Sequence, residues 1–175
     1  MDRRQIKSRR DIFAAFGRLL TKKRFSNITV GEIIAEADVC RSTFYSHFET
    51  KDALLSAFCS DIFDHILEES ICDFGGEASL DSRLSHILWH LQKQKEMTCS
   101  LLTGDSEGLL MNSLKKQLLR LFSLHIKDFT DEVPYDFVIN HLSASFCEAI
   151  RWWVHSNMEP EPSTVSGYFL RINGI

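Results

Sequence analysis

Proline is scarce in this chain, and the few prolines come late. Its 175 residues include only three, at Pro134, Pro160 and Pro162. No alternation of apolar and polar residues is long enough to predict a β-strand, whereas apolar residues recur three and four apart along most of the chain. These absences exclude a fold built on sheets. The sequence therefore predicts an all-α protein of about nine helices.

Long hydrophobic runs are also absent. No apolar stretch approaches the roughly 20 residues that a membrane helix requires. The first residues, MDRRQIKSRR, lead into an amphipathic pattern and not into the apolar centre of a signal peptide. We therefore expect a cytoplasmic protein that makes no contact with a membrane.

Cysteine is too sparse and too widely spaced to form a framework. The five cysteines are an odd number without a C-x-x-C pair, which argues against a disulfide scaffold and against a zinc knuckle; they are Cys40, Cys59, Cys72, Cys99 and Cys147. Reduced and mostly buried thiols are expected. A redox-sensing thiol is left open as an alternative.

Positive charge is concentrated at one end of a chain whose net charge is −4. Residues 1–51 hold 11 Lys and Arg against 6 Asp and Glu, whereas the other 124 residues hold 9 against 18. A basic head on an acidic body favours a division of tasks in which the head meets phosphates. A solvated basic surface without a partner is the alternative.

Apolar periodicity and capping residues place the helices. Thr29 followed by Glu32 is a capping-box signature, Asp38 suits a left-handed turn, and Thr50 suits an N-cap. Gly75 and Gly76 interrupt the helical pattern, and Pro134 and Pro162 suit first turns. The expected ranges are about 5–23, 29–38, 41–48, 51–71, 80–97, 105–130, 134–157 and 162–172.

Residues 41–48 form an amphipathic helix of unusual composition. At 100° per residue, Phe44 and Phe48 share one face, while Ser42 and Ser46 lie opposite, flanked by Thr43 and Tyr45. With the short helix and the turn before it, this arrangement predicts a helix-turn-helix. Its second helix would present small hydrogen-bonding groups to base edges in the major groove.

The segment ITVGEIIAEADVCRSTFYSHFETKDALL resembles the DNA-binding region of TetR-family transcriptional regulators. The resemblance covers about residues 5–60 and is carried by Thr29, Ile33 or Ile34, Ala37, Val39, Thr43, Phe44, Tyr45, His47, Phe48, Lys51 and Leu54. It implies that Thr29, Tyr45 and Lys51 hold phosphates, that Arg41, Ser42, Thr43 and Ser46 face the groove, and that His47 touches the backbone at its edge. Structural alternatives are a helix cap for Thr29, packing for Tyr45 and His47, and a solvated side chain for Lys51.

Two positions depart from the family pattern. Asp38 stands where glycine is common, which places a negative charge near the DNA. Gly31 stands where many relatives carry a longer side chain that contacts a base. The operator sequence of a relative therefore does not transfer to this chain.

The resemblance implies a DNA-binding domain at 1–50 and a regulatory and dimerisation domain at 51–175. A homodimer is expected through the last two helices, about 134–172, so that two heads read a two-fold operator. A small-molecule effector is expected in the body, with candidate pocket residues Trp89, Met97, Met111, Phe122, Phe146 and Trp152. Core packing is the alternative reading of these six residues.

Other functional classes have less support. No nucleophile motif or phosphate loop is present, so we expect no enzyme and no cofactor. His86 and His90 have the spacing of two metal ligands, but no third ligand is evident. A second group raises the same possibility but fits the solvated face of a helix, namely Asp61, Asp64, His65 and Glu68. No metal is therefore expected. The leading prediction is a transcriptional regulator, namely an effector-responsive repressor. The alternatives are a co-activating member whose body binds a protein, and a purely structural helical dimer.

Overall fold

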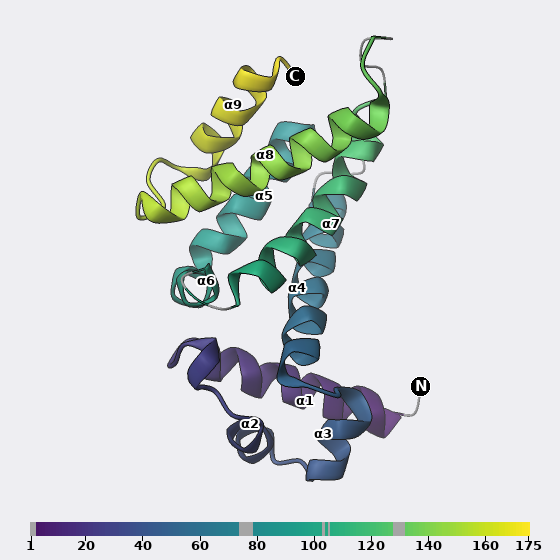
Figure 1. Ribbon diagram of the computed structural model, residues 1–175, viewed down its shortest axis with the longest axis vertical. Helices are drawn as coiled ribbons and strands as arrows, with labels where there is room; N and C mark the ends of the chain where they lie inside the picture. Colours follow the sequence, from purple (N-terminus) through teal and green to yellow (C-terminus); the bar gives the residue numbers. More distant parts are fainter. Residues whose placement is uncertain (1–2, 74–78, 103, 105, 128–131) are drawn as a thin grey trace. The chain divides into compact units, whose positions relative to one another are not determined.

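The computed structural model describes residues 3–73, 79–102, 104, 106–127 and 132–175. Over these residues the chain forms nine α-helices and one 3₁₀ helix, without a strand (Figure 1). The all-α prediction is confirmed. The elements are α1 (Arg3–Leu20), η1 (Phe25–Asn27), α2 (Val30–Ala37), α3 (Arg41–His47), α4 (Lys51–Asp73), α5 (Leu80–Lys93), α6 (Lys95–Leu102), α7 (Glu107–His125), α8 (Tyr135–His155) and α9 (Pro162–Asn173).

Most helix starts follow the sequence signals. Thr50 accepts a hydrogen bond from the Ala53 amide at the start of α4, at 3.0 Å. Pro162 is the first residue of α9, and Pro134 directly precedes α8. The side chains of Glu68 and Cys72, together with Gly75 and Gly76, lie outside the described residues.

One expected helix is two helices. The range 80–97 divides at Gln94, whose φ of −111° and ψ of 38° end α5 before α6 begins at Lys95. Neither glycine nor proline marks this break, so the apolar pattern runs through it unchanged. The expected range 105–130 is also shorter, because α7 ends at His125.

The chain packs as two compact units, which divide it differently from the expected boundary at residue 50. One unit holds residues 1–59 and 95–110, and the other holds residues 60–94 and 111–175. A functional boundary at residue 50 stays a prediction.

Phenylalanines dominate the core of the first unit. Phe13 stacks on Phe48 with ring centroids 5.6 Å apart, and Phe58 lies edge-on to both Phe13 and Phe16, at 5.6 and 5.3 Å. Large buried rings contribute most of the apolar area in such a core. Through Phe48, this cluster anchors the end of α3 to α1.

In the second unit, α9 packs along α5 and against α8. Ser166 of α9 is fully buried, and its hydroxyl donates to the Asp81 carboxylate of α5 at 2.5 Å. Trp153 of α8 is also fully buried, and its indole N–H donates to the Pro160 carbonyl at 2.7 Å. Both bonds satisfy buried polar groups; the first joins α9 to α5, and the second joins α8 to the segment that leads into α9.

Among the described residues, no helix combines the length and the hydropathy that spanning a bilayer requires.

Candidate nucleic-acid interface

The capping box predicted for α2 is present. The Thr29 hydroxyl accepts from the Glu32 amide at 3.2 Å, and the Glu32 carboxylate accepts from the Thr29 amide at 2.9 Å and from its hydroxyl at 3.0 Å. Lys23 forms an ion pair with the same carboxylate. Hydrogen bonding to Lys23, and then to Thr29, lowers the pKa of Glu32 to about 2. The N-terminus of α2 is therefore capped by the side chains of Thr29 and Glu32.

Asp38 makes the turn between α2 and α3. Its φ of 51° and ψ of 48° lie in the left-handed region. The Asp38 amide donates to the Ala35 carbonyl at 3.3 Å, and the Val39 amide donates to the Ile34 carbonyl at 3.2 Å. This pair of bonds is a Schellman motif, which satisfies the last carbonyls of α2 and reverses the chain.

The predicted division of α3 into an inner and an outer face agrees with its burial. Phe44 is fully buried and Phe48, directly after the helix, is 5 % exposed. The outer positions are Arg41, Ser42, Tyr45 and Ser46, which are exposed, and Thr43 and His47, which are half-buried. The helix is therefore anchored by rings on one side and open to a ligand on the other.

The outer side chains of α3 differ in how far they are already engaged. The Ser46 hydroxyl donates to the Thr43 carbonyl at 2.8 Å, and the Arg41 guanidinium lies 5.7 Å from the ring of Tyr45. Tyr45 is 44 % exposed, and its hydroxyl has no hydrogen-bond partner among the described residues. The His47 ring lies 6.0 Å from that of Phe48. Tyr45 therefore has a hydroxyl donor to offer.

Lys51 and Thr29 have structural roles in addition to any contact with DNA. The Lys51 ammonium donates to the carbonyls of Phe25 and Ile28, both at 2.8 Å, and lies 4.3 Å from the ring of Phe25. Lysine has three N–H donors, so one is left. The Thr29 hydroxyl hydrogen is donated to Glu32. A phosphate contact by either residue stays a prediction.

Arg18 joins two helices through contacts that the sequence pattern did not predict. Its Nε donates to the Glu36 carboxylate at 2.7 Å, and its guanidinium also reaches the Glu36 carbonyl at 3.3 Å, joining α1 to the end of α2. Because 18 residues separate the two partners, no local spacing predicts the pair.

The six candidate pocket residues fall into two kinds. Phe122 and Phe146 are fully buried against Phe169, with ring centroids 5.8 and 5.0 Å apart, and Met97 and Met111 are buried as well. Trp89 and Trp152 are about half-exposed and border separate surface hollows. An effector pocket built from this set stays a prediction.

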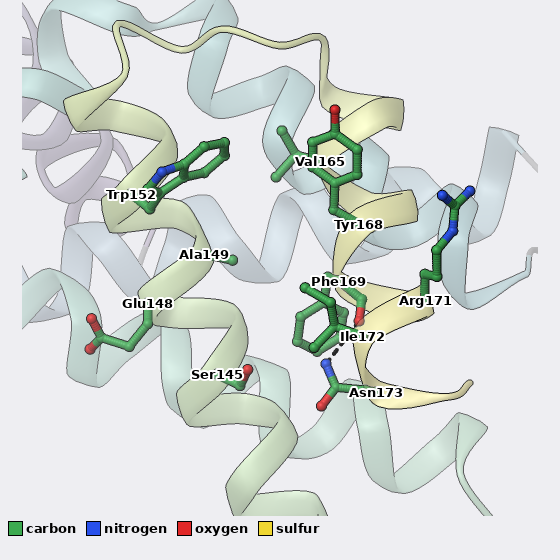
Figure 2. Close-up of a pocket in the computed structure, with 10 residues that line it drawn as sticks. All are labelled: Ser145, Glu148, Ala149, Trp152, Val165, Tyr168, Phe169, Arg171, Ile172 and Asn173. Atoms are coloured by element: carbon green, nitrogen blue, oxygen red, sulfur yellow. Dashed lines mark hydrogen bonds between the residues drawn. The ribbon is translucent and has the colours of Figure 1, made fainter.

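A groove of about 470 Å³ runs between α8 and α9 (Figure 2). Trp152 and Ala149 line it from α8, and Tyr168 and Ile172 line it from α9. A neighbouring hollow of about 340 Å³ shares Ile172 and adds Phe137, whose ring stacks on that of His141. We define the α8–α9 face as Phe137, Trp152, Tyr168 and Ile172, which are 61 %, 52 %, 46 % and 84 % exposed. Exposed large apolar side chains that gather on one face are typical of interaction surfaces.

Two family models match the chain. One, described as "Bacterial regulatory proteins, tetR family", matches residues 12–58, and the other, described as "Transcriptional regulator C-terminal region", matches residues 79–172. The first match includes all of α2 and α3 and ends within α4.

Individual proteins similar to this chain are also named as regulators of transcription or as an operon activator. The structure of a TetR transcriptional regulator from Streptococcus agalactiae 2603V is 30 % identical, with a TM-score of 0.76 over 98 % of this chain and 96 % of that one. The dihydroxyacetone kinase operon activator DhaS has a TM-score of 0.69 at 16 % identity, covering 95 % and 93 % of the two chains. The uncharacterized HTH-type regulator YxbF of Bacillus subtilis (strain 168) is 32 % identical over 71 residues, which are 38 % of this chain and 19 % of YxbF.

Proposed function

Because the chain belongs to the TetR family of bacterial transcriptional regulators, we propose that it binds a DNA operator as a homodimer and represses transcription until an effector releases it. The observation that carries the proposal is the geometry of α3. Phe44 and Phe48 hold one side of this helix in the core, and the other side presents hydroxyl groups and an arginine to solvent.

The outer face of α3 suits the major groove. Ser42, Thr43 and Ser46 are short, so a helix backbone can approach the base edges closely, and Arg41 can reach a guanine. Tyr45 would donate its hydroxyl to a phosphate, and His47 would contact the backbone at the groove edge. Lys51 would contribute its remaining N–H, and Thr29 would bind a phosphate only by redirecting its hydroxyl from Glu32.

The α8–α9 face supports the homodimer. A two-fold operator needs two heads related by a two-fold axis. Trp152 and Ile172 of this face expose large apolar side chains that a second copy would bury. Two helices from each copy would then form a four-helix interface.

Activation of transcription is the alternative to repression. DhaS, which is named as an operon activator, has the same fold at 16 % identity, so the fold does not decide between repression and activation. The burial of Phe122 and Phe146 means that these two rings pack in the core and do not line an open pocket. A reporter driven by the operator separates repression from activation: repression predicts that deleting the gene raises expression, and activation predicts that it lowers expression.

Fluorescence anisotropy tests the DNA contacts. The labelled probe is DNA from upstream of the protein's own gene, titrated at low and moderate salt. Tight binding that weakens with salt is expected. Thr43→Ala should cost about 1–3 kcal/mol and relax sequence preference, and Tyr45→Phe should weaken binding to all sequences by a similar amount.

Tyr135→Phe is the matched control for Tyr45→Phe, because both tyrosines are 44 % exposed and Tyr135 lies on α8. It should leave DNA affinity unchanged. Weak binding that ignores both sequence and salt, or equal affinities of all variants, would refute the proposed role of α3.

A further inference from the structure

The outward side of α5 carries two imidazoles that approach each other closely. His86 and His90 are one helical turn apart, and their Nε2 atoms lie 3.1 Å from each other. Their ring centroids are 4.5 Å apart, and both residues are half-buried. Residues four apart share one helix face, so both rings lie on the same side of α5, with their Nε2 atoms adjacent.

This nitrogen separation matches that of two ligands on one metal ion. A metal–imidazole bond is about 2.0–2.1 Å long. Two such ligands are therefore about 2.9 Å apart at a right angle and about 3.3 Å apart at a tetrahedral angle. We propose that His86 and His90 chelate a divalent transition-metal ion of the group that prefers imidazole, such as Ni²⁺, Cu²⁺ or Zn²⁺.

Neighbouring side chains hold the two rings in place. The ring of Trp89 stacks on His86, with centroids 6.1 Å apart, and lies edge-on to His90 at 4.8 Å. Lys93 covers Trp89, with its ammonium 4.7 Å from the ring. An ion would bind rings that are already oriented, although the Lys93 charge opposes it.

The remaining coordination positions are open to water. A surface hollow of about 470 Å³ borders His86 and is also lined by the exposed residues Asp81 and Glu161. These two carboxylates favour a cation near the site. Within the described residues, no group of three or more His, Cys, Asp and Glu side chains is placed to hold a metal, so the protein supplies two ligands and water supplies the others.

Binding requires a lone pair on both Nε2 atoms. In the present contact, one ring donates its Nε2 hydrogen to the other. A neutral imidazole carries one hydrogen and can hold it on Nδ1 instead. The donor ring would therefore change tautomer and the ion would replace the shared hydrogen, with no net loss of a proton from the neutral pair. This site rests on α5 and its hollow alone and does not depend on the proposed DNA-binding function.

Calorimetric titration of the full chain with NiCl₂ in a chelator-free buffer tests the site. One saturable site per chain is expected. His86→Ala and His90→Ala should each weaken binding about tenfold or more, because even residues that only orient a metal ligand contribute about 10–100-fold. The controls His155→Ala and Cys40→Ser remove exposed ligands elsewhere and should leave the affinity unchanged.

Indole fluorescence gives a second readout in the unmutated binding site. Ni²⁺ held beside Trp89 should quench part of the emission with the same affinity, and His86→Ala and His90→Ala should weaken the quenching as much as they weaken calorimetric binding. The helical circular dichroism of each variant checks folding. The proposal is overturned if the wild type shows no saturable site, if the folded histidine variants retain full affinity, or if the quenching persists unchanged in those variants.

Discussion

Lys51 shows how a single residue can stabilise the first unit. Its ammonium donates to the carbonyls of Phe25 and Ile28, both at 2.8 Å. Lys51→Met keeps a long apolar stem but leaves both carbonyls without this donor, so the free energy of unfolding should fall by about 1–3 kcal/mol. Urea denaturation measures the change. The control Lys22→Met, at an exposed position, should stay within about 0.5 kcal/mol.

At Asp38, the backbone conformation restricts which residues the position tolerates. Its φ of 51° is costly for most side chains but tolerated by Asp and Asn. Asp38→Ala should destabilise the protein by about 1–2 kcal/mol, whereas Asp38→Asn should change stability by less than about 0.5 kcal/mol. Thermal unfolding of the two variants compares them directly. Equal loss in both would show that the carboxylate matters and that the backbone conformation does not.

At the scale of the element, the start of α2 should respond to acid. Lys23 and Thr29 lower the pKa of Glu32 from 4.5 to about 2, so the folded state favours the carboxylate. The contribution of the Glu32 carboxylate to the free energy of unfolding is fully present above pH 4.5 and is lost as the pH falls from there towards 2. The stability difference between the wild type and Glu32→Gln should therefore shrink across this window in urea titrations.

Glu49→Gln controls for a general effect of charge, because Glu49 is an exposed carboxylate of the same unit, outside the capping box. Its stability difference from the wild type measures the general effect of removing one carboxylate charge from this unit. A constant difference for Glu32→Gln across the window would show that the capping box and the Lys23 ion pair do not couple Glu32 to folding.

At the scale of the whole molecule, the proposed dimer depends on the α8–α9 face. Ile172, which is 84 % exposed, would lie in the apolar centre of that interface. Ile172→Lys should raise the dimer dissociation constant about tenfold or more, because it places an unpaired charge there. Sedimentation equilibrium measures this change.

Leu124→Lys is the control for the dimer, since Leu124 is an apolar residue of α7 that is 68 % exposed and lies outside that face. Its self-association should match that of the wild type. A wild-type chain that sediments as a monomer, or an unchanged constant for Ile172→Lys, would contradict the proposed interface. Operator affinity should fall together with dimerisation.

Local signals were enough to predict the helix-turn-helix. The capping box joins Thr29 to Glu32, the turn depends on the backbone of Asp38, and Phe44 and Phe48 are one turn apart. Each of these features involves residues a few positions apart, so the sequence by itself determined them, and with them the all-α fold and the resemblance to the family.

Only the tertiary structure decided features that join distant residues. Lys51 meets carbonyls 23 and 26 residues away, and the break at Gln94 has no local marker. The sequence shows four large apolar residues on helices, but not which of them another helix covers: Phe122, Phe146, Trp89 and Trp152. Packing buried the first two and left the others exposed, because burial is a property of what the rest of the chain places against a side chain.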